Sequence, residues 1–159
     1  SNTLQSEKKP KEGYEAAGWH PLSEDETGGS LFDKLAVLGG VSLIDTLKEL
    51  EAGNIKPVKQ SDTDTEYARM LTKEDGNIDW SKSAAEIERL VRGLNPWPSA
   101  YTKLNGKTLK IWKARVSDTG DDGNPLCFKT GKGYLIAEEV QLEGKKRMDA
   151  KTFLLGYKK

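Results

Sequence analysis

The sequence of 159 residues is poor in the residue types that most often carry chemistry. It contains one cysteine, Cys127, and one histidine, His20. Cys127 cannot form a disulfide within the chain, which favours a reducing compartment and predicts a cytoplasmic protein. No apolar run approaches the ~20 residues that a membrane-spanning helix needs. The sequence therefore predicts no membrane partner.

The few candidate metal ligands and catalytic groups lack partners at the spacing that such sites require. His20 lies beside Trp19 and Pro21 with no Cys, His or carboxylate at ligand spacing, so we interpret it as a surface residue. The carboxylates around Asp75 and Asp121 lack the alternating oxygen ligands and the closing glutamate of an EF-hand loop. The sequence predicts no catalytic residue and no metal ligand in this chain.

Charge is balanced overall, with 25 basic and 25 acidic residues, but it is unevenly distributed. Residues 1–66 hold 7 basic and 13 acidic side chains, residues 67–98 hold 5 of each, and residues 99–159 hold 13 basic and 7 acidic. An excess of basic residues suits a polyanion such as nucleic acid, although surface lysines also serve solubility. The final third is therefore the candidate for a nucleic-acid interface.

The first third of the chain predicts a poorly ordered segment followed by two short helices. Residues 1–22 are polar and show no period of 2 or 3.6. Apolar stripes then predict a helix over residues 30–38, which ends at Gly39-Gly40, and a second helix over residues 43–50. Two such helices cannot close a core by themselves, so they need a partner surface.

Residues 81–98 predict one capped helix followed by a rigid turn. Ser83 and Glu86 have the spacing of a capping box, and apolar residues follow at helical spacing. The two prolines that flank Trp97 cannot continue a helix, so the chain must leave in an extended conformation. We expect Trp97 to be mostly buried against this helix or the sheet that follows.

From residue 100 onward the pattern changes to short strands separated by glycine and asparagine turns. The predicted strands cover residues 100–104, 107–116, 126–129 and 134–142. Asn105-Gly106 is a two-residue hairpin signal. Apolar positions change parity at Trp112, which predicts a bulge or a strand buried on both faces. With a last helix from Asp149, this pattern predicts a mostly β fold with α-helices, a small OB-like antiparallel barrel preceded by the capped helix.

Six blocks of the sequence resemble the C-terminal part of methionyl-tRNA formyltransferase in their order and approximate spacing. They are Glu74-Asp75-Gly76, Ile78-Asp79-Trp80, Ser83-Ala84, Arg92-Gly93-Leu94-Asn95-Pro96-Trp97-Pro98, Leu109-Lys110-Ile111 and Glu143-Gly144-Lys145-Lys146-Arg147-Met148. Upstream, Glu26-Thr27-Gly28-Gly29-Ser30-Leu31 and Asp33-Lys34-Leu35 are similar to the last helices of the family's folate-binding domain. The resemblance covers about residue 22 to the end.

The resemblance implies a tRNA-binding barrel, its linker and a helical remnant of an α/β domain. The family transfers a formyl group from 10-formyltetrahydrofolate to the methionyl amine of initiator tRNA in translation initiation, using an Asn, a His and an Asp of the preceding domain. His20 does not match the surroundings of that histidine. We therefore expect this chain to be non-catalytic and to bind no cofactor itself. Its expected partners are initiator methionyl-tRNA and the missing N-terminal catalytic domain.

These expectations divide the chain into four parts. Residues 1–22 are a disordered segment or a remnant of processing or cloning, since the chain starts with Ser1 rather than Met. Residues 23–53 are the helical tail of the catalytic domain, residues 54–66 are a linker, and residues 67–159 are the C-terminal OB-like tRNA-binding domain.

Eight basic residues are the candidates for contacts with nucleic acid. They are Arg69, Lys73, Lys103, Lys110, Lys113, Lys145, Lys146 and Arg147. For each of them the alternative is a solvated surface residue, because adjacent side chains on a strand or turn point in different directions.

Two other functions stay open at this point. One is a related barrel attached to a formyltetrahydrofolate dehydrogenase or a nucleotide-sugar formyltransferase. The other is a structural barrel that only packs on the catalytic domain. The run from Arg92 to Pro98 and the turn from Lys145 to Arg147 favour the tRNA enzyme.

Overall fold

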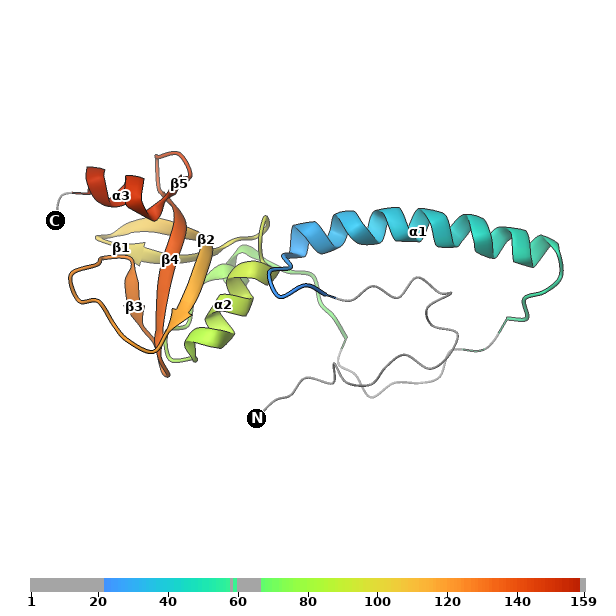
Figure 1. The fold of residues 1–159 in the computed structure, drawn as a ribbon, viewed down its shortest axis with the longest axis horizontal. Coiled ribbons are helices and arrows are strands. Elements are labelled where there is room, and N and C mark those ends of the chain that lie inside the picture. The colour runs from blue at the N-terminus through green and yellow to red at the C-terminus, as the bar shows by residue number, and fades with distance from the viewer. Residues whose placement is uncertain (1–21, 58, 60–66, 158–159) are drawn as a thin grey trace. The chain divides into compact units, whose positions relative to one another are not determined.

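The computed structural model describes residues 22–57, 59 and 67–157 (Figure 1). His20 therefore lies outside the described residues, as does most of the predicted segment 1–22 and of the predicted linker. By its contacts the chain forms two compact units, one of residues 1–24 and 30–67 and one of residues 25–29 and 68–159. The division into domains predicted from the sequence stays a prediction.

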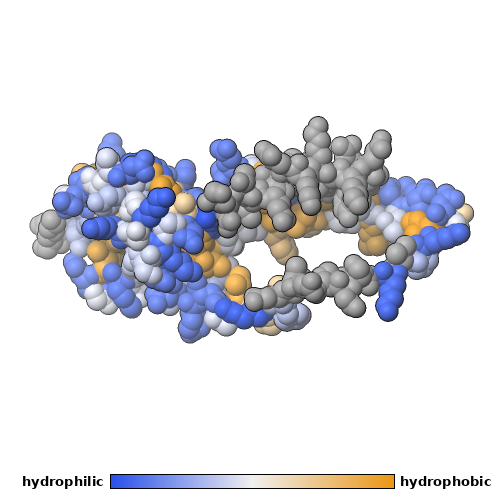
Figure 2. Space-filling model, turned by 90° about the horizontal axis from the view of Figure 1, so that it is seen from below, coloured by the Kyte–Doolittle hydropathy of each residue, from blue (hydrophilic) through white to orange (hydrophobic). Residues whose placement is uncertain are grey.

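Helix α1, Gly28–Glu51, is one continuous helix of 24 residues, so the prediction of two short helices is wrong. A glycine inside a helix costs only about 1 kcal/mol relative to alanine, so Gly39-Gly40 need not end it. None of its residues is buried, and its apolar side chains are exposed, Phe32 by 73% and Leu47 by 53%. Hydrophobic surface, orange in Figure 2, is visible along this helix. Among the described residues no helix is both long and apolar enough to cross a membrane.

The β-rich unit is built on an antiparallel sheet that curls into a half-barrel. Its strands are β1 (Ala100–Leu104), β2 (Lys107–Ser117), β3 (Cys127–Lys129), β4 (Tyr134–Leu142) and β5 (Met148–Asp149). They lie in the order β1-β2-β4-β3, and β5 pairs with β4. The predicted fold class, mostly antiparallel β with helices, is confirmed, although the short strand β5 was missed.

Two local features of the sheet follow the sequence closely. Asn105 and Gly106 form the turn between β1 and β2 with φ angles of +48° and +77°, as the two-residue hairpin turn requires. The register of β2 against β4 shifts between Ile111 and Lys113, which is the predicted bulge at Trp112. The bulge lets β2 bend while it keeps apolar residues directed at the core on both sides.

Helix α2, Ala84–Gly93, covers one face of the sheet (Figure 1). Ser83 Oγ accepts a hydrogen bond from Glu86 N, and the Glu86 carboxylate accepts one from Ser83 N, so the predicted capping box is confirmed. The helix buries Ile87 and Val91. The core that it shares with the sheet consists of Ile78, Ile87, Val91, Ala100, Leu109, Ile111, Leu126, Leu135, Ala137, Val140 and Phe153.

The segment of residues 25–29 belongs to the β-rich unit and packs at the end of α2. Arg92 Nη1 donates a hydrogen bond to the carbonyl oxygen of Glu26 at 3.0 Å. Gly29 N donates to the carbonyl oxygen of Asn95 at 2.9 Å. These bonds hold residues 25–29 against the C-terminal end of α2.

Residues 77–83 connect the two edges of the sheet before α2 begins. Ile78 N donates to the carbonyl oxygen of Tyr101 in β1, and Ala84 N donates to that of Lys132 just after β3, both at 3.0 Å. Among the described residues β1 and β3 do not pair with each other. This segment therefore satisfies backbone groups that open edges would leave exposed.

The last helix, α3, spans Ala150–Gly156 and begins one residue after the start predicted at Asp149, which caps it. Asp149 Oδ1 accepts a hydrogen bond from Thr152 N at 2.7 Å. Phe153 is buried in the core, whereas Leu155 is 84% exposed. A helix of two turns presents only one narrow stripe to its neighbour, and Leu155 lies outside it.

Trp97 is 58% exposed, so the prediction that it is mostly buried is wrong. The turn that contains it is held instead by Asn95, whose Nδ2 donates to the carbonyl oxygen of Trp112 at 3.2 Å. The tryptophan that packs against the core is Trp80, whose ring stacks on Phe128 with the centroids 4.6 Å apart.

Candidate nucleic-acid interface

The face of the sheet turned away from α2 carries mostly polar and charged side chains. Tyr101, Lys110 and Gln141 lie side by side across β1, β2 and β4. Directly opposed residues of antiparallel strands point to the same face, whereas Leu109 and Ile111 are buried on the other. We call this surface the outer face; by the strand register it includes Tyr101, Lys103, Thr108, Lys110, Trp112 and Gln141.

Trp112 is the centre of the outer face. Lys110 Nζ lies 5.5 Å from the centroid of its ring, and Arg147 Cζ lies 4.7 Å from it. A cation over an indole face is electrostatically favourable. Trp112 Nε1 donates to Gln141 Oε1 at 3.3 Å, and Gln141 Nε2 donates to the carbonyl oxygen of Lys145 at 3.1 Å. These bonds tie the ring to β4 and to the turn between β4 and β5.

Arg147 is fixed against this ring by an ion pair with Glu139. Its Nε and Nη2 donate to the two oxygens of the Glu139 carboxylate, Nη2 at 3.0 Å. These hydrogen bonds, together with the positive charge, hold the pKa of Glu139 below its ordinary value, so the pair stays ionised at neutral pH. The Arg147 side chain is still 44% exposed. Its charge is largely balanced, but its guanidinium plane is held in place.

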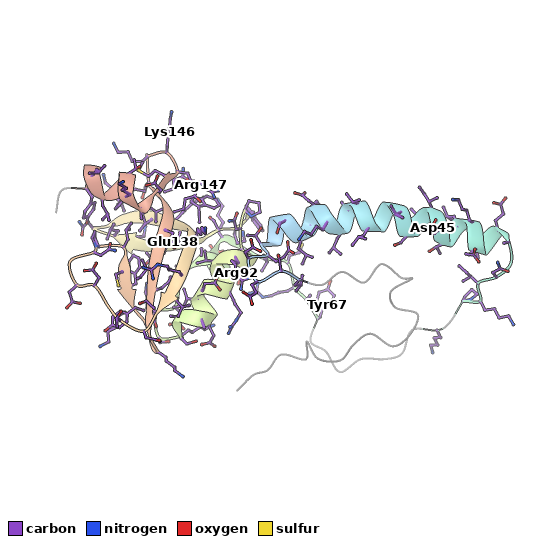
Figure 3. All side chains as sticks on the ribbon, in the orientation of Figure 1. Asp45, Tyr67, Arg92, Glu138, Lys146 and Arg147 are labelled. Atoms are coloured by element: carbon purple, nitrogen blue, oxygen red, sulfur yellow. The ribbon has the colours of Figure 1, made fainter. Side chains whose placement is uncertain are left out.

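The turn between β4 and β5 carries two lysines for which the described part of the chain shows no carboxylate partner. Lys145 and Lys146 are exposed and form no ion pair within the part of the chain that the structure describes. Figure 3 shows Lys146 pointing outward from this turn. Beside the turn is a hollow of about 290 Å³, lined by Thr108, Lys110, Gln141, Leu142, Glu143 and Gly144. The Glu143 carboxylate accepts a hydrogen bond from Thr108 N at 2.9 Å, which lowers the pKa of Glu143.

The two other strand lysines that we predicted as contacts have partners within the sheet. Lys103 Nζ donates to Thr108 Oγ1 at 2.8 Å on the outer face. Lys113 lies within the bulge, opposite Glu139 in the register, and its Nζ is 3.7 Å from Glu138, a carboxylate that also lies 3.5 Å from Arg115 Nε. The charge of Lys113 is therefore partly balanced.

Arg69 and Lys73 lie on a different segment, at the short 3-10 helix η1 (Lys73–Gly76). Arg69 donates from Nη1 and Nη2 to the Asp75 carboxylate, the first bond being 2.9 Å long. The hydrogen bonds from Arg69, together with that from Thr72 N, hold the pKa of Asp75 well below its ordinary value. The charge of Arg69 is thus balanced locally, whereas Lys73 forms no ion pair among the described residues.

Trp112 and Gln141 belong to this surface but were not predicted from the sequence as site residues. A signal for Trp112 was present, since Lys110-Ile111-Trp112 alternates and places the indole on the face of Lys110. Gln141 could not be found in this way, because its place beside Lys110 depends on the register of β4. In the described ranges, no group of three or more His, Cys, Asp or Glu residues could hold a metal ion.

The fold is a capped helix packed on an antiparallel half-barrel that has lysines on its outer face. Comparison with known families identifies the class to which this domain belongs. The chain belongs to the family described as "Formyl transferase, C-terminal domain", whose model matches residues 70–158. More particularly, it is 52% identical over 145 residues to a methionyl-tRNA formyltransferase of Agathobacter rectalis, covering 85% of this chain and 47% of that protein. It is 51% identical over 150 residues to the enzyme of Lachnospira eligens, covering 85% and 48%. The resemblance seen in the sequence is confirmed, and the chain spans about half the length of these curated relatives.

Solved structures share the fold at lower identity. A crystal structure of a HypX variant from Aquifex aeolicus matches with a TM-score of 0.60 and 18% identity, covering 88% of this chain and 27% of that one. HypX from the same organism in complex with tetrahydrofolic acid matches with a TM-score of 0.57 and 18% identity, covering 86% and 26%. At this identity the likeness concerns the fold alone.

Proposed function

We propose that this chain is the tRNA-binding portion of a cytoplasmic enzyme that formylates methionyl initiator tRNA in translation initiation. The formyl donor is 10-formyltetrahydrofolate, and catalysis belongs to a part of the enzyme outside this chain. The names of the relatives with 52% and 51% identity support the reaction. The contact surface is the outer face of the sheet together with the turn between β4 and β5, an OB-like arrangement.

The observation that carries the proposal is how charge is balanced on this surface. Its carboxylates are already engaged, Glu139 by Arg147 and Glu143 by the backbone of Thr108. Lys145 and Lys146 have no such partner among the described residues. A polyanion that approaches this surface therefore meets two ammonium groups that form no ion pair among the described residues, and each contact with a phosphate releases condensed counterions.

The surface of α1 supports the second part of the proposal, that the chain works beside another domain. Its apolar side chains, such as Phe32 and Leu47, are exposed by more than half. An exposed apolar stripe of this length is typical of a helix that packs on another surface. The relatives are about twice as long as this chain, which leaves room for a domain that would cover it.

We give no residue of this chain a role toward the formyl donor, because the resemblance places folate binding in the preceding domain of the family.

The proposal is tested by filter binding of initiator methionyl-tRNA to the chain between about 50 and 200 mM salt. The logarithm of the affinity should fall with the logarithm of the salt concentration by about 0.7 to 0.9 for each phosphate contact. Replacing Lys145 and Lys146 together by Ala should flatten this slope by about one to two units. A wild-type chain with no salt-dependent binding would identify a structural barrel instead.

A matched control is the double replacement of Lys82 and Lys132 by Ala. Both lysines are exposed, and Lys132 lies just before β4, at the opposite end of this strand from the turn. Because β4 has nine residues at about 3.4 Å each, the two ends are far apart. The control variant loses the same charge and should keep the wild-type slope. An equal loss in both variants would show that only net charge matters.

A further inference from the structure

Among the described residues, Arg147 is the ion-paired arginine whose guanidinium also lies over an aromatic ring. Glu139 binds one edge of its guanidinium, and Arg147 Cζ lies over the ring of Trp112, 4.7 Å from its centroid. The Arg147 side chain is still 44% exposed. Its guanidinium is therefore a flat cationic group held in place, and part of the side chain is open to solvent.

A flat cationic surface of this kind is suited to a nucleobase. Proteins that recognise unpaired RNA bases stack them on aromatic rings or on guanidinium planes. Stacking tolerates every base, because every base has a π-face. A base inside a duplex is already stacked on both of its faces, so it cannot stack on the guanidinium. The surface therefore distinguishes unpaired from paired nucleotides rather than one sequence from another.

The side chains around the Arg147 guanidinium are placed to contact the phosphate and the ribose of the same nucleotide. Lys110 lies over the same indole and also lines the hollow of about 290 Å³ beside the turn. Gln141, which lines this hollow as well, has its amide orientation fixed by bonds to Trp112 and to the carbonyl oxygen of Lys145. A phosphate can meet the ammonium group of Lys110 while the ribose occupies the hollow.

We propose that Lys110, Trp112, Gln141 and Arg147 form a site for one unpaired nucleotide of RNA, whose base stacks on the guanidinium of Arg147. Trp112 holds the guanidinium of Arg147 in place. It is a positioning residue, because it acts through Arg147. The inference rests on the proposed binding of tRNA and deepens it by naming the kind of nucleotide that the outer face takes.

The test is the replacement Arg147→Lys, which keeps the charge and removes the plane. Its probes are an oligouridylate of about eight nucleotides and a blunt RNA duplex with the same number of phosphates. Losing one stacked base should weaken oligouridylate binding about tenfold, since stacking is worth about 1–3 kcal/mol and each 1.4 kcal/mol is tenfold. The salt dependence of binding and the affinity for the duplex should not change.

Arg115→Lys is the matched control. Arg115 also lies on the sheet and pairs with a carboxylate, Glu138, but it has no ring contact among the described residues. This variant should bind both probes as the wild type does. Trp112→Phe keeps a flat support under Arg147 and should bind oligouridylate within about twofold of the wild type, whereas Trp112→Leu should lose as much affinity as Arg147→Lys.

The outcomes separate this inference from the function on which it rests. Salt-dependent binding of tRNA by the wild type, with Arg147→Lys equal to it on both probes, would overturn the stacking site and leave the tRNA interface intact. No binding of any RNA by the wild type would overturn both. A loss on oligouridylate alone, at unchanged salt dependence and unchanged thermal midpoint, would establish the site.

Discussion

The guanidinium of Arg147 lies over the indole of Trp112, with Cζ 4.7 Å from the ring centroid, while Glu139 binds it from the side. The three consecutive basic residues of the turn therefore do not act alike. Lys145 and Lys146 present free charge, whereas Arg147 presents a plane whose charge is already balanced. The proposed interface therefore assigns electrostatic attraction to Lys145 and Lys146 and base stacking to Arg147.

The first prediction concerns Glu139→Gln. This change removes the carboxylate that balances Arg147, so one more cation becomes available to RNA. The salt dependence of tRNA binding should become steeper by up to about 0.7 to 0.9. Filter binding across the same salt range measures it. Glu138→Gln is the control, because that carboxylate pairs with Lys113 and Arg115 rather than with Arg147. If both variants gave the wild-type slope, Arg147 would not lie within the tRNA interface.

The second prediction concerns the segment that connects the edges of the sheet. A Cβ at Gly131 would lie 1.9 Å from the carbonyl oxygen of Ser81, so Gly131→Ala must push this backbone away. We expect a loss of about 1–3 kcal/mol in the free energy of unfolding. Gly93→Ala is the control, since a Cβ there meets nothing within 4 Å and alanine favours a helix. Urea denaturation of the two variants checks this, and equal midpoints would mean that the segment does not hold the edges.

Local chemistry explains which parts of the fold could be predicted from the sequence. The turn at Asn105-Gly106, the capping box of Ser83 and Glu86 and the bulge at Trp112 each depend on residues close in the chain. Strand β5 was missed because two residues carry no pattern, and only pairing with β4 makes them a strand. The continuity of α1 was missed because two glycines weaken a helix without ending it.

The candidate site, like the fold, could be predicted only in part from the sequence. The sequence shows where basic residues are, but not which of them meet carboxylates. Arg69 pairs with Asp75, six residues along the chain, and Arg147 pairs with Glu139 of β4. The support under Arg147 comes from β2, whose register against β4 is set by the whole sheet. Neither pairing follows from spacing alone.

The third prediction compares two tryptophans. Trp80 stacks on Phe128, and its Nε1 donates to Thr102 Oγ1 at 3.0 Å, so Trp80→Ala should cost about 3 kcal/mol of unfolding free energy. Trp97 is 58% exposed, so Trp97→Ala should cost about 1 kcal/mol or less. Denaturant midpoints of the two variants measure this. The reverse order would place the structural tryptophan in the turn after α2.

The last prediction concerns pH and the pair of Arg69 with Asp75. The hydrogen bonds of Arg69 hold the pKa of Asp75 below its ordinary value of 3.8. A carboxyl whose pKa is lowered by folding adds stability that is fully present above its ordinary pKa and is lost as the pH falls through the folded value. Arg69→Gln should therefore raise the pKa of Asp75. The stability difference between this variant and the wild type should shrink progressively between about pH 5 and about pH 1.

An NMR titration of the carboxyl groups, combined with denaturation at each pH, measures both effects. Glu86 is the internal control, because hydrogen bonds from Ser83 lower its pKa and Arg69 takes no part in them. Its pKa should be unchanged in Arg69→Gln and should rise in Ser83→Ala. An unchanged pKa of Asp75 in Arg69→Gln would mean that the pair does not form in solution. Arg69 would then be uncompensated and available to tRNA, and Arg69→Gln would flatten the salt dependence of tRNA binding by about 0.7 to 0.9.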